Sequence, residues 1–79
     1  MTPGNAFATV LKNIRKSAGI SQEALASESG LDRTYISLLE RGLRQPSLST
    51  IFQISASLKI KPFELIRLVS ELVDEGTSK

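Results

Sequence analysis

The stretch of sequence that decides the fold is SQEALASESGLDRTYISLLER, which covers residues 21–41. It holds two short runs of helix-forming residues, and each run follows a side chain that caps helix N-termini well, Ser21 or Asp32. Between the runs lies a short turn in which Gly30 supplies the residue that tolerates a positive φ. The stretch therefore predicts two short helices joined by a tight turn.

Small and apolar residues occur where these two helices have to pack together. Ala24 is small enough to let the helices approach closely, and Leu31 is placed to pack under the turn. Leu25, Ile36 and Leu39 supply apolar contacts between the two helices. Each feature alone is weak, but their order and spacing together predict a helix-turn-helix motif.

Three further helices are expected around this motif. The first runs from about Asn5 to Ser17, with apolar residues at helical spacing, and ends at Gly19. A later helix follows Pro46 and is capped by Ser47, and the last covers about residues 62–75 and opens on a proline. No strand pattern, repeat or linker interrupts residues 1–79, so we expect one all-α domain of five helices.

The composition excludes several classes of function. The chain has 79 residues and contains neither cysteine nor histidine, which removes disulfides, most metal sites and most nucleophile–base pairs. It also lacks a glycine-rich phosphate loop, so we expect no enzyme activity, no cofactor, no metal and no small-molecule ligand. Because neither a signal peptide nor a membrane-spanning run is present, we expect a cytoplasmic protein without a membrane partner.

The charge is distributed unevenly along the chain. Residues 1–61 hold eight of the ten basic groups and four of the eight acidic ones, and the remainder holds two basic and four acidic groups. The basic part of the chain is a modest indication of a polyanionic partner.

The chain resembles the Xre/Cro family of bacterial and phage regulators from about Val10 to Leu72. The matching segments are Ile14-Arg15, residues 19–26 (GISQEALA), residues 30–37 (GLDRTYIS), residues 39–42 (LERG), residues 46–48 (PSL) and Ile51. The size and the segment LDRTYIS are also similar to restriction–modification controller proteins, and to many other Xre regulators. The resemblance implies a lambda-repressor-like fold and a transcriptional regulator that binds a palindromic operator in double-stranded DNA as a homodimer.

The second helix of the motif would then be the recognition helix, whose N-terminal residues meet base edges in the major groove. Arg33 can make a bidentate contact with guanine, and Thr34 can offer its hydroxyl to a base or its methyl to thymine. Ser37 lies one turn later on the same face as Arg33. Tyr35 can reach a phosphate through its hydroxyl, or it can be a half-buried core residue.

The resemblance places Gln22 at the DNA backbone, and Arg41 and Arg44 follow the recognition helix as phosphate contacts, with Lys12 and Lys16 as weaker candidates. Arg33 and Arg44 can alternatively be ordinary surface charges. The family often carries a polar base-reading residue where this chain has Leu38, so Leu38 either touches a thymine methyl or is inert. The predicted DNA-binding set is Gln22, Arg33, Thr34, Tyr35, Ser37, Arg41 and Arg44.

Arg15 and Glu40 look functional, but the resemblance implies that they pair inside the fold. In the family, the arginine and glutamate at these places tie the first helix to the third. We therefore expect a structural pair, and a direct functional role is the alternative.

The last helix is too apolar for a helix with one buried face. One stripe consists of Phe63, Ile66, Val69 and Val73, and a second consists of Leu65, Leu68 and Leu72. If one stripe covers the core, the other forms an exposed apolar patch of the kind that marks an interface. We predict that Leu65, Leu68 and Leu72 form a dimer interface, although the pattern does not say which stripe points outward, and both stripes can be internal.

An alternative function of another class is a protein–protein adaptor or an antitoxin-type subunit that uses the same fold. The outward set of Arg33, Thr34 and Ser37 argues against that as the sole role. The amino-acid sequence does not indicate the operator, the target gene or whether the protein activates or represses transcription.

Overall fold

The computed structural model describes the backbone of residues 1–77 and the side chains of residues 1–75. Its elements are α1 (Pro3–Ser17), α2 (Gln22–Ser29), α3 (Arg33–Glu40), α4 (Leu48–Leu58) and α5 (Pro62–Thr77). No strand occurs in this described part, so the expectation of a five-helix, all-α fold is confirmed. Helix α1 begins earlier than the predicted Asn5, because the Thr2 side chain caps it and a proline takes the first helical position.

The capping residues expected from the sequence hold the helix starts. Ser21 Oγ accepts a hydrogen bond from the backbone nitrogen of Ala24 at 3.0 Å, and Asp32 Oδ2 accepts one from Thr34 at 3.2 Å. Gly30 ends α2 with a φ of 74°, the left-handed conformation that the turn needs. These local signals fix where α3 begins, and therefore which residues its first turn presents.

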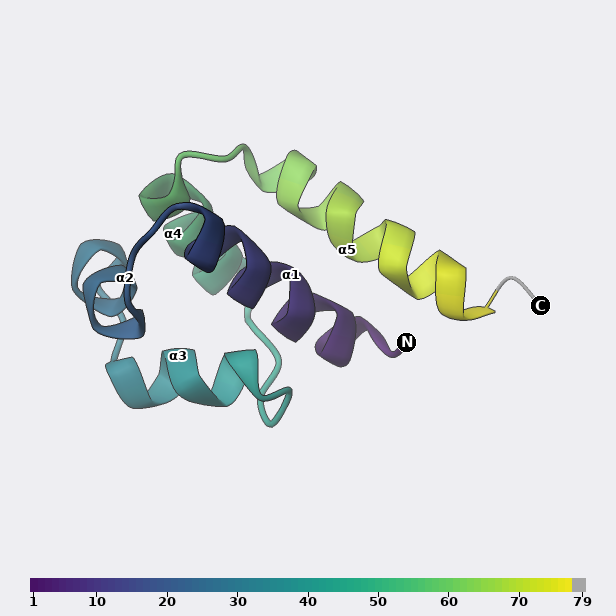
Figure 1. The fold of residues 1–79 in the computed structure, drawn as a ribbon, viewed down its shortest axis with the longest axis horizontal. Helices are drawn as coiled ribbons and strands as arrows, with labels where there is room; N and C mark the ends of the chain where they lie inside the picture. The colour runs from purple at the N-terminus through teal and green to yellow at the C-terminus, as the bar shows by residue number, and fades with distance from the viewer. Residues whose placement is uncertain (78–79) are drawn as a thin grey trace.

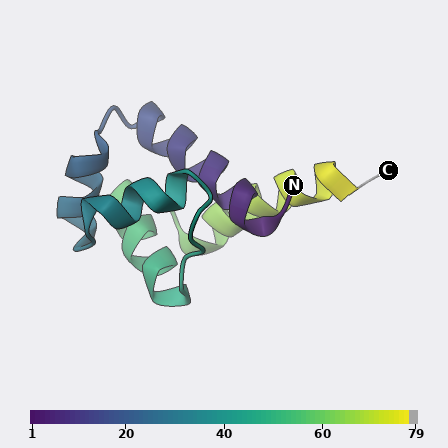
Figure 2. The same cartoon turned by 90° about the horizontal axis from the view of Figure 1, so that it is seen from below.

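Helix α1 lies in the middle of the molecule, with α3 on one side and α5 on the other (Figure 1). The chain directions of α1 and α5 are opposed, and α2 and α4 close the end of the molecule where α1 finishes (Figures 1 and 2). The fully buried large apolar side chains come from every helix and form one core: Leu11, Leu25, Ile36, Leu39, Ile54 and Leu65. Helices α3 and α5 thus share α1 as a common support.

The prediction that Leu65 belongs to a dimer interface is wrong. Leu65 is fully buried in the core, because α5 packs against both α1 and α4. Leu68 and Leu72 are half-buried against that core and line a groove with Val10 and Ile14 of α1. The exposed apolar side chains of α5 belong instead to the beginning of the other stripe.

None of the helices described here combines the length and the apolar character that a membrane crossing requires.

Candidate nucleic-acid interface

The first turn of α3 projects into solvent. Asp32 caps the helix, and the side chains of Arg33 and Thr34 that follow it are exposed. Arg33 has no ion-pair partner among the residues whose side chains the structure describes. An unpaired guanidinium and a hydroxyl at an exposed helix start are free to meet the edges of bases.

One face of α3 continues this exposed turn toward the end of the helix. Arg33, Ser37 and Glu40 lie at positions i, i+4 and i+7, so their side chains leave the helix on the same side. Ser37 is half-buried and Glu40 is buried. The face therefore passes from an exposed cation at its beginning to a buried carboxylate at its end.

The hydroxyl of Tyr35 has a partner inside the domain. It lies 3.3 Å from Thr50 Oγ1, which in turn lies 2.9 Å from the hydroxyl of Ser47, the residue that caps α4. The ring is half-buried against the core. Tyr35 thus links α3 to the start of α4, and a phosphate would have to share its hydroxyl with Thr50.

Arg41 and Arg44 extend the positive charge beyond α3. Arg41 is the C-cap residue of α3, Arg44 lies in the connection to α4, and both side chains are exposed. Within the described side chains, neither arginine lies in an ion pair. By contrast, Arg67 on α5 is bonded to both Glu64 and Glu71. The unneutralised arginines are therefore concentrated around α3.

Arg15 and Glu40 form a buried, two-pronged ion pair between α1 and α3. Arg15 Nε donates to Glu40 Oε2 at 2.5 Å, and Arg15 Nη2 donates to Glu40 Oε1 at 3.0 Å. The remaining nitrogen, Nη1, donates to the backbone oxygen of Ile20 at 2.9 Å, which holds the connection between α1 and α2. Gln22 Nε2 also donates to Glu40 Oε1, at 3.0 Å.

The pKa of Glu40 reflects two opposing influences. Burial would raise its pKa, but the hydrogen bonds from Arg15 and Gln22 outweigh burial and hold the pKa below its ordinary value. The hydrogen bonding of Arg15 to the Glu40 carboxylate also raises the pKa of Arg15. Both groups are charged at neutral pH, and each is costly to remove alone because its partner would remain buried and unpaired.

A second surface, on α4 and α5, is apolar and exposed. Leu48 and Phe52 leave α4 one turn apart, and Phe63 and Ile66 leave the first turns of α5; their exposed fractions are 73%, 55%, 68% and 43%. We refer to these four residues, with the half-buried Ile51, as the α4–α5 apolar surface. Leu48 and Phe52 were not among the predicted site residues, although their spacing of four places them on one face of a short helix.

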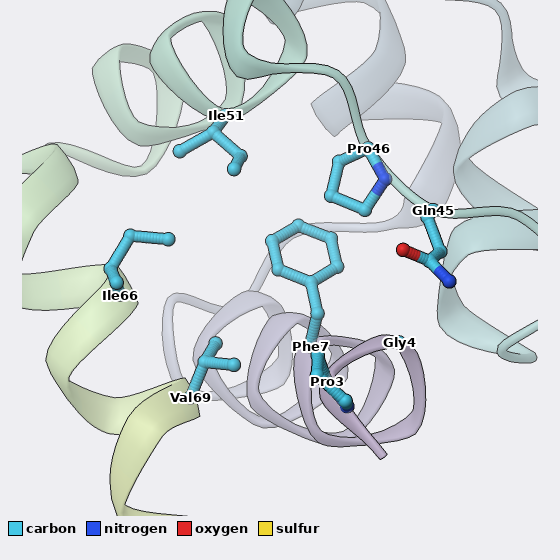
Figure 3. Close-up of a pocket in the computed structure, with 8 residues that line it drawn as sticks. All are labelled: Pro3, Gly4, Phe7, Gln45, Pro46, Ile51, Ile66 and Val69. Atoms are coloured by element: carbon cyan, nitrogen blue, oxygen red, sulfur yellow. The ribbon is translucent and has the colours of Figure 1, made fainter. Parts of the chain in front are cut away.

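The edge of this surface is hollowed. Ile51 and Ile66 face each other across the hollow, and the ring of the buried Phe7 lies between them and Pro46 (Figure 3). Its remaining lining residues are small, apolar or uncharged. No cluster of metal-ligating side chains occurs in the part of the chain with described side chains. The hollow is thus lined mainly by apolar side chains.

Comparison with known proteins identifies the family. The family model described as Helix-turn-helix matches residues 11–65. The control protein C.BamHI of Bacillus amyloliquefaciens is 46% identical over 61 residues, which cover 76% of this chain and 75% of that protein. The chain belongs to the helix-turn-helix family, of the Xre/Cro type.

Solved structures share the fold. The restriction–modification controller protein C.AhdI from Aeromonas hydrophila superposes with a TM-score of 0.75 and 44% identity, covering 77% of this chain and 92% of that one. The controller protein C.Esp1396I, solved as a tetramer in complex with its natural 35-base-pair operator, gives a TM-score of 0.77 and 36% identity over 87% of this chain and 96% of that one.

Proposed function

We propose that this protein is a sequence-specific transcriptional regulator that binds a palindromic operator in double-stranded DNA as a homodimer. The observation that carries the proposal is the exposed first turn of α3, where the side chains of Arg33 and Thr34 have no partner among the described residues and Asp32 fixes the helix start. The likeness to C.Esp1396I, solved on its operator, supports the same mode of action here. Helix α3 would lie in the major groove.

The contacts divide into base-reading and phosphate-binding groups. Arg33, Thr34 and Ser37 are placed to read bases, because they follow one another along the start of α3. Arg41 and Arg44 are placed to bind phosphates, since they carry unneutralised charge on the flank of that helix. Two residues, Gln22 and Tyr35, are bonded within the domain, so any DNA contact they make is oriented by those bonds.

The α4–α5 apolar surface is the face that we assign to the dimer. It is more exposed than the groove lined by Leu68 and Leu72, and large apolar side chains gathered on one face mark an interface. A twofold axis through this surface would present two α3 helices to successive turns of the major groove. The interface would then set the spacing of the two half-sites.

Two further assignments rest on the same reasoning. We place the protein in the cytoplasm, where a regulator of this class meets its DNA. We assign it no catalytic activity of its own, because the side chains around α3 are arranged to bind a polyanion and offer no nucleophile–base pair.

The proposal is tested by fluorescence anisotropy with the DNA upstream of the protein's own gene and a scrambled duplex, each at two salt concentrations. Binding that is tight for the upstream DNA and weak for the scrambled duplex would support a sequence-specific regulator. Equal, weak binding to both would send the search to randomised duplexes. If selection from random DNA also enriches no sequence, sequence-specific binding is wrong.

The dimer surface is tested by sedimentation of Phe52→Glu against Ser49→Glu. Both variants add one carboxylate to an exposed position of α4, but only Phe52 lies on the α4–α5 apolar surface. We expect Phe52→Glu to sediment as a monomer and Ser49→Glu as a dimer. A Phe52→Glu protein that stays dimeric would move the interface to another face.

A further inference from the structure

The side chain of Gln22 is held in place from inside the domain. Gln22 is the first residue of α2, it is half-buried, and its Nε2 donates to Glu40 Oε1 at 3.0 Å. The same carboxylate accepts the Nε and Nη2 hydrogen bonds of Arg15. Three hydrogen bonds therefore fix Glu40, and one of them fixes the amide of Gln22.

This amide lies beside the face of α3 that we assign to DNA. Arg33 and Ser37 occupy the first two positions of that face, and Glu40, which binds Gln22, occupies the third. A glutamine amide nitrogen carries two hydrogens, and Glu40 takes only one. The second hydrogen and the amide oxygen are available to a group that approaches α3 from outside.

We infer that Glu40 is a positioning residue for DNA binding, which holds the Gln22 amide so that its second N–H meets a backbone phosphate. The inference rests on the proposed function. Glu40 itself would not touch DNA, because it is buried and its carboxylate would repel a phosphate. Its effect arises because a glutamine already fixed in one rotamer loses less conformational entropy on binding than a mobile one.

A purely structural pair would stabilise the fold without selecting the orientation of Gln22. The two roles differ in one measurable quantity, the coupling between Gln22 and Glu40 in DNA binding. A double-mutant cycle isolates that coupling from changes in stability. Removing Arg15 and Glu40 together avoids leaving one buried charge, so Arg15→Met with Glu40→Leu is the suitable pair variant.

Anisotropy with operator DNA is measured for the parent, for Gln22→Ala, for the pair variant and for the pair variant with Gln22→Ala. We expect Gln22→Ala to raise Kd about tenfold in the parent and no more than about threefold in the pair variant, because a mobile glutamine contributes less. The salt dependence should stay unchanged on losing Gln22, since a neutral amide releases no counterion. An equal effect of Gln22→Ala in both backgrounds would overturn the positioning role.

A conservative variant guards against a pair variant that folds poorly. Glu40→Gln loses the charge but keeps an oxygen that can accept from Gln22. We therefore expect Arg15→Met with Glu40→Gln to bind at least about threefold more tightly than Arg15→Met with Glu40→Leu, because only the former keeps an acceptor for Gln22. Equal affinities of these two double variants would contradict the inference.

Nuclear magnetic resonance of the Gln22 side-chain amide gives a readout that needs no DNA. In the parent, one Nε2 hydrogen should exchange slowly with water because Glu40 binds it, and in the pair variant both should exchange fast. If no DNA sequence binds the parent, the proposed function fails, whatever this spectrum shows. If the parent binds an operator but the cycle shows no coupling, only the positioning role fails.

Discussion

The backbone of Gly42 passes directly against the side chain of Asn5, so the turn after α3 is fitted to the first turns of α1. Gly42 has a φ of 74°, and a Cβ placed there would overlap the Asn5 side-chain oxygen. The connection that carries Arg41 and Arg44 is therefore seated on α1. Gly19 has nearly the same φ, 75°, but a Cβ there would meet open space.

Alanine substitutions at Gly19 and Gly42 separate the cost of a left-handed alanine from the cost of overpacking. Gly19→Ala should lower the free energy of unfolding by about 1 kcal/mol, the cost of a left-handed alanine. Gly42→Ala should lower it by a further 1–3 kcal/mol or so, because overpacking against Asn5 adds to the same backbone strain. Urea unfolding followed by circular dichroism measures both. Equal losses would mean that the Asn5 side chain moves aside at no cost.

Replacing Arg33 by alanine should remove discrimination at one base pair of each half-site. The expected loss for the preferred site is about 1–3 kcal/mol, and the loss for duplexes altered at that position should be smaller. Anisotropy titrations against a set of single-base operator variants give these values. Arg67→Ala is the control, because Arg67 is an exposed arginine on α5 that is bonded to Glu64 and Glu71. Uniform weakening across all duplexes would make Arg33 a phosphate contact.

Replacing Arg44 by alanine should weaken binding to every duplex by a similar factor. Because a phosphate contact releases a counterion, the slope of log K against log salt concentration should become shallower by about one for each protomer. Titrations at four or more salt concentrations determine the slope. An unchanged slope would show that Arg44 is an ordinary surface charge.

The pair of Arg15 and Glu40 should make stability depend on pH in the acid range. The folded-state pKa of Glu40 lies below its ordinary value of 4.5, so its ionised form favours the folded state. That stabilisation is complete above pH 4.5 and is lost as the pH falls through the lowered pKa. Urea unfolding from pH 7 to pH 2 should show a steeper loss for the parent than for Arg15→Met with Glu40→Leu. Parallel curves would contradict the lowered pKa.

The sequence allowed the five helices, and the starts of all but α1, to be predicted because those signals are local. Ser21, Asp32 and Ser47 each cap the helix that follows, and a helix cap involves residues only two or three positions away. Gly30 marks the turn for the same reason. The exposure of Arg33 followed directly from the cap at Asp32.

Features that depend on contacts between distant helices were harder to predict. The periodicity of α5 revealed two apolar stripes, but only its packing on α1 and α4 shows that Leu65 is buried and Ile66 exposed. The bond from Gln22 to Glu40 spans 18 positions, and that from Tyr35 to Thr50 spans 15. No pattern within one helix carries such information.

The unpaired arginines and most of the carboxylates of the C-terminal helix lie on opposite sides of α1. The unpaired arginines surround α3, and the described part of α5, on the other side of the molecule (Figure 1), carries four carboxylates against one arginine, Arg67. A domain with this charge distribution has an electric dipole moment. The field of a nearby polyanion would orient such a domain before the two molecules touch. On the proposed function, a domain that approached DNA with α5 forward would be repelled and would rotate, so that collisions would occur preferentially with α3 toward the duplex.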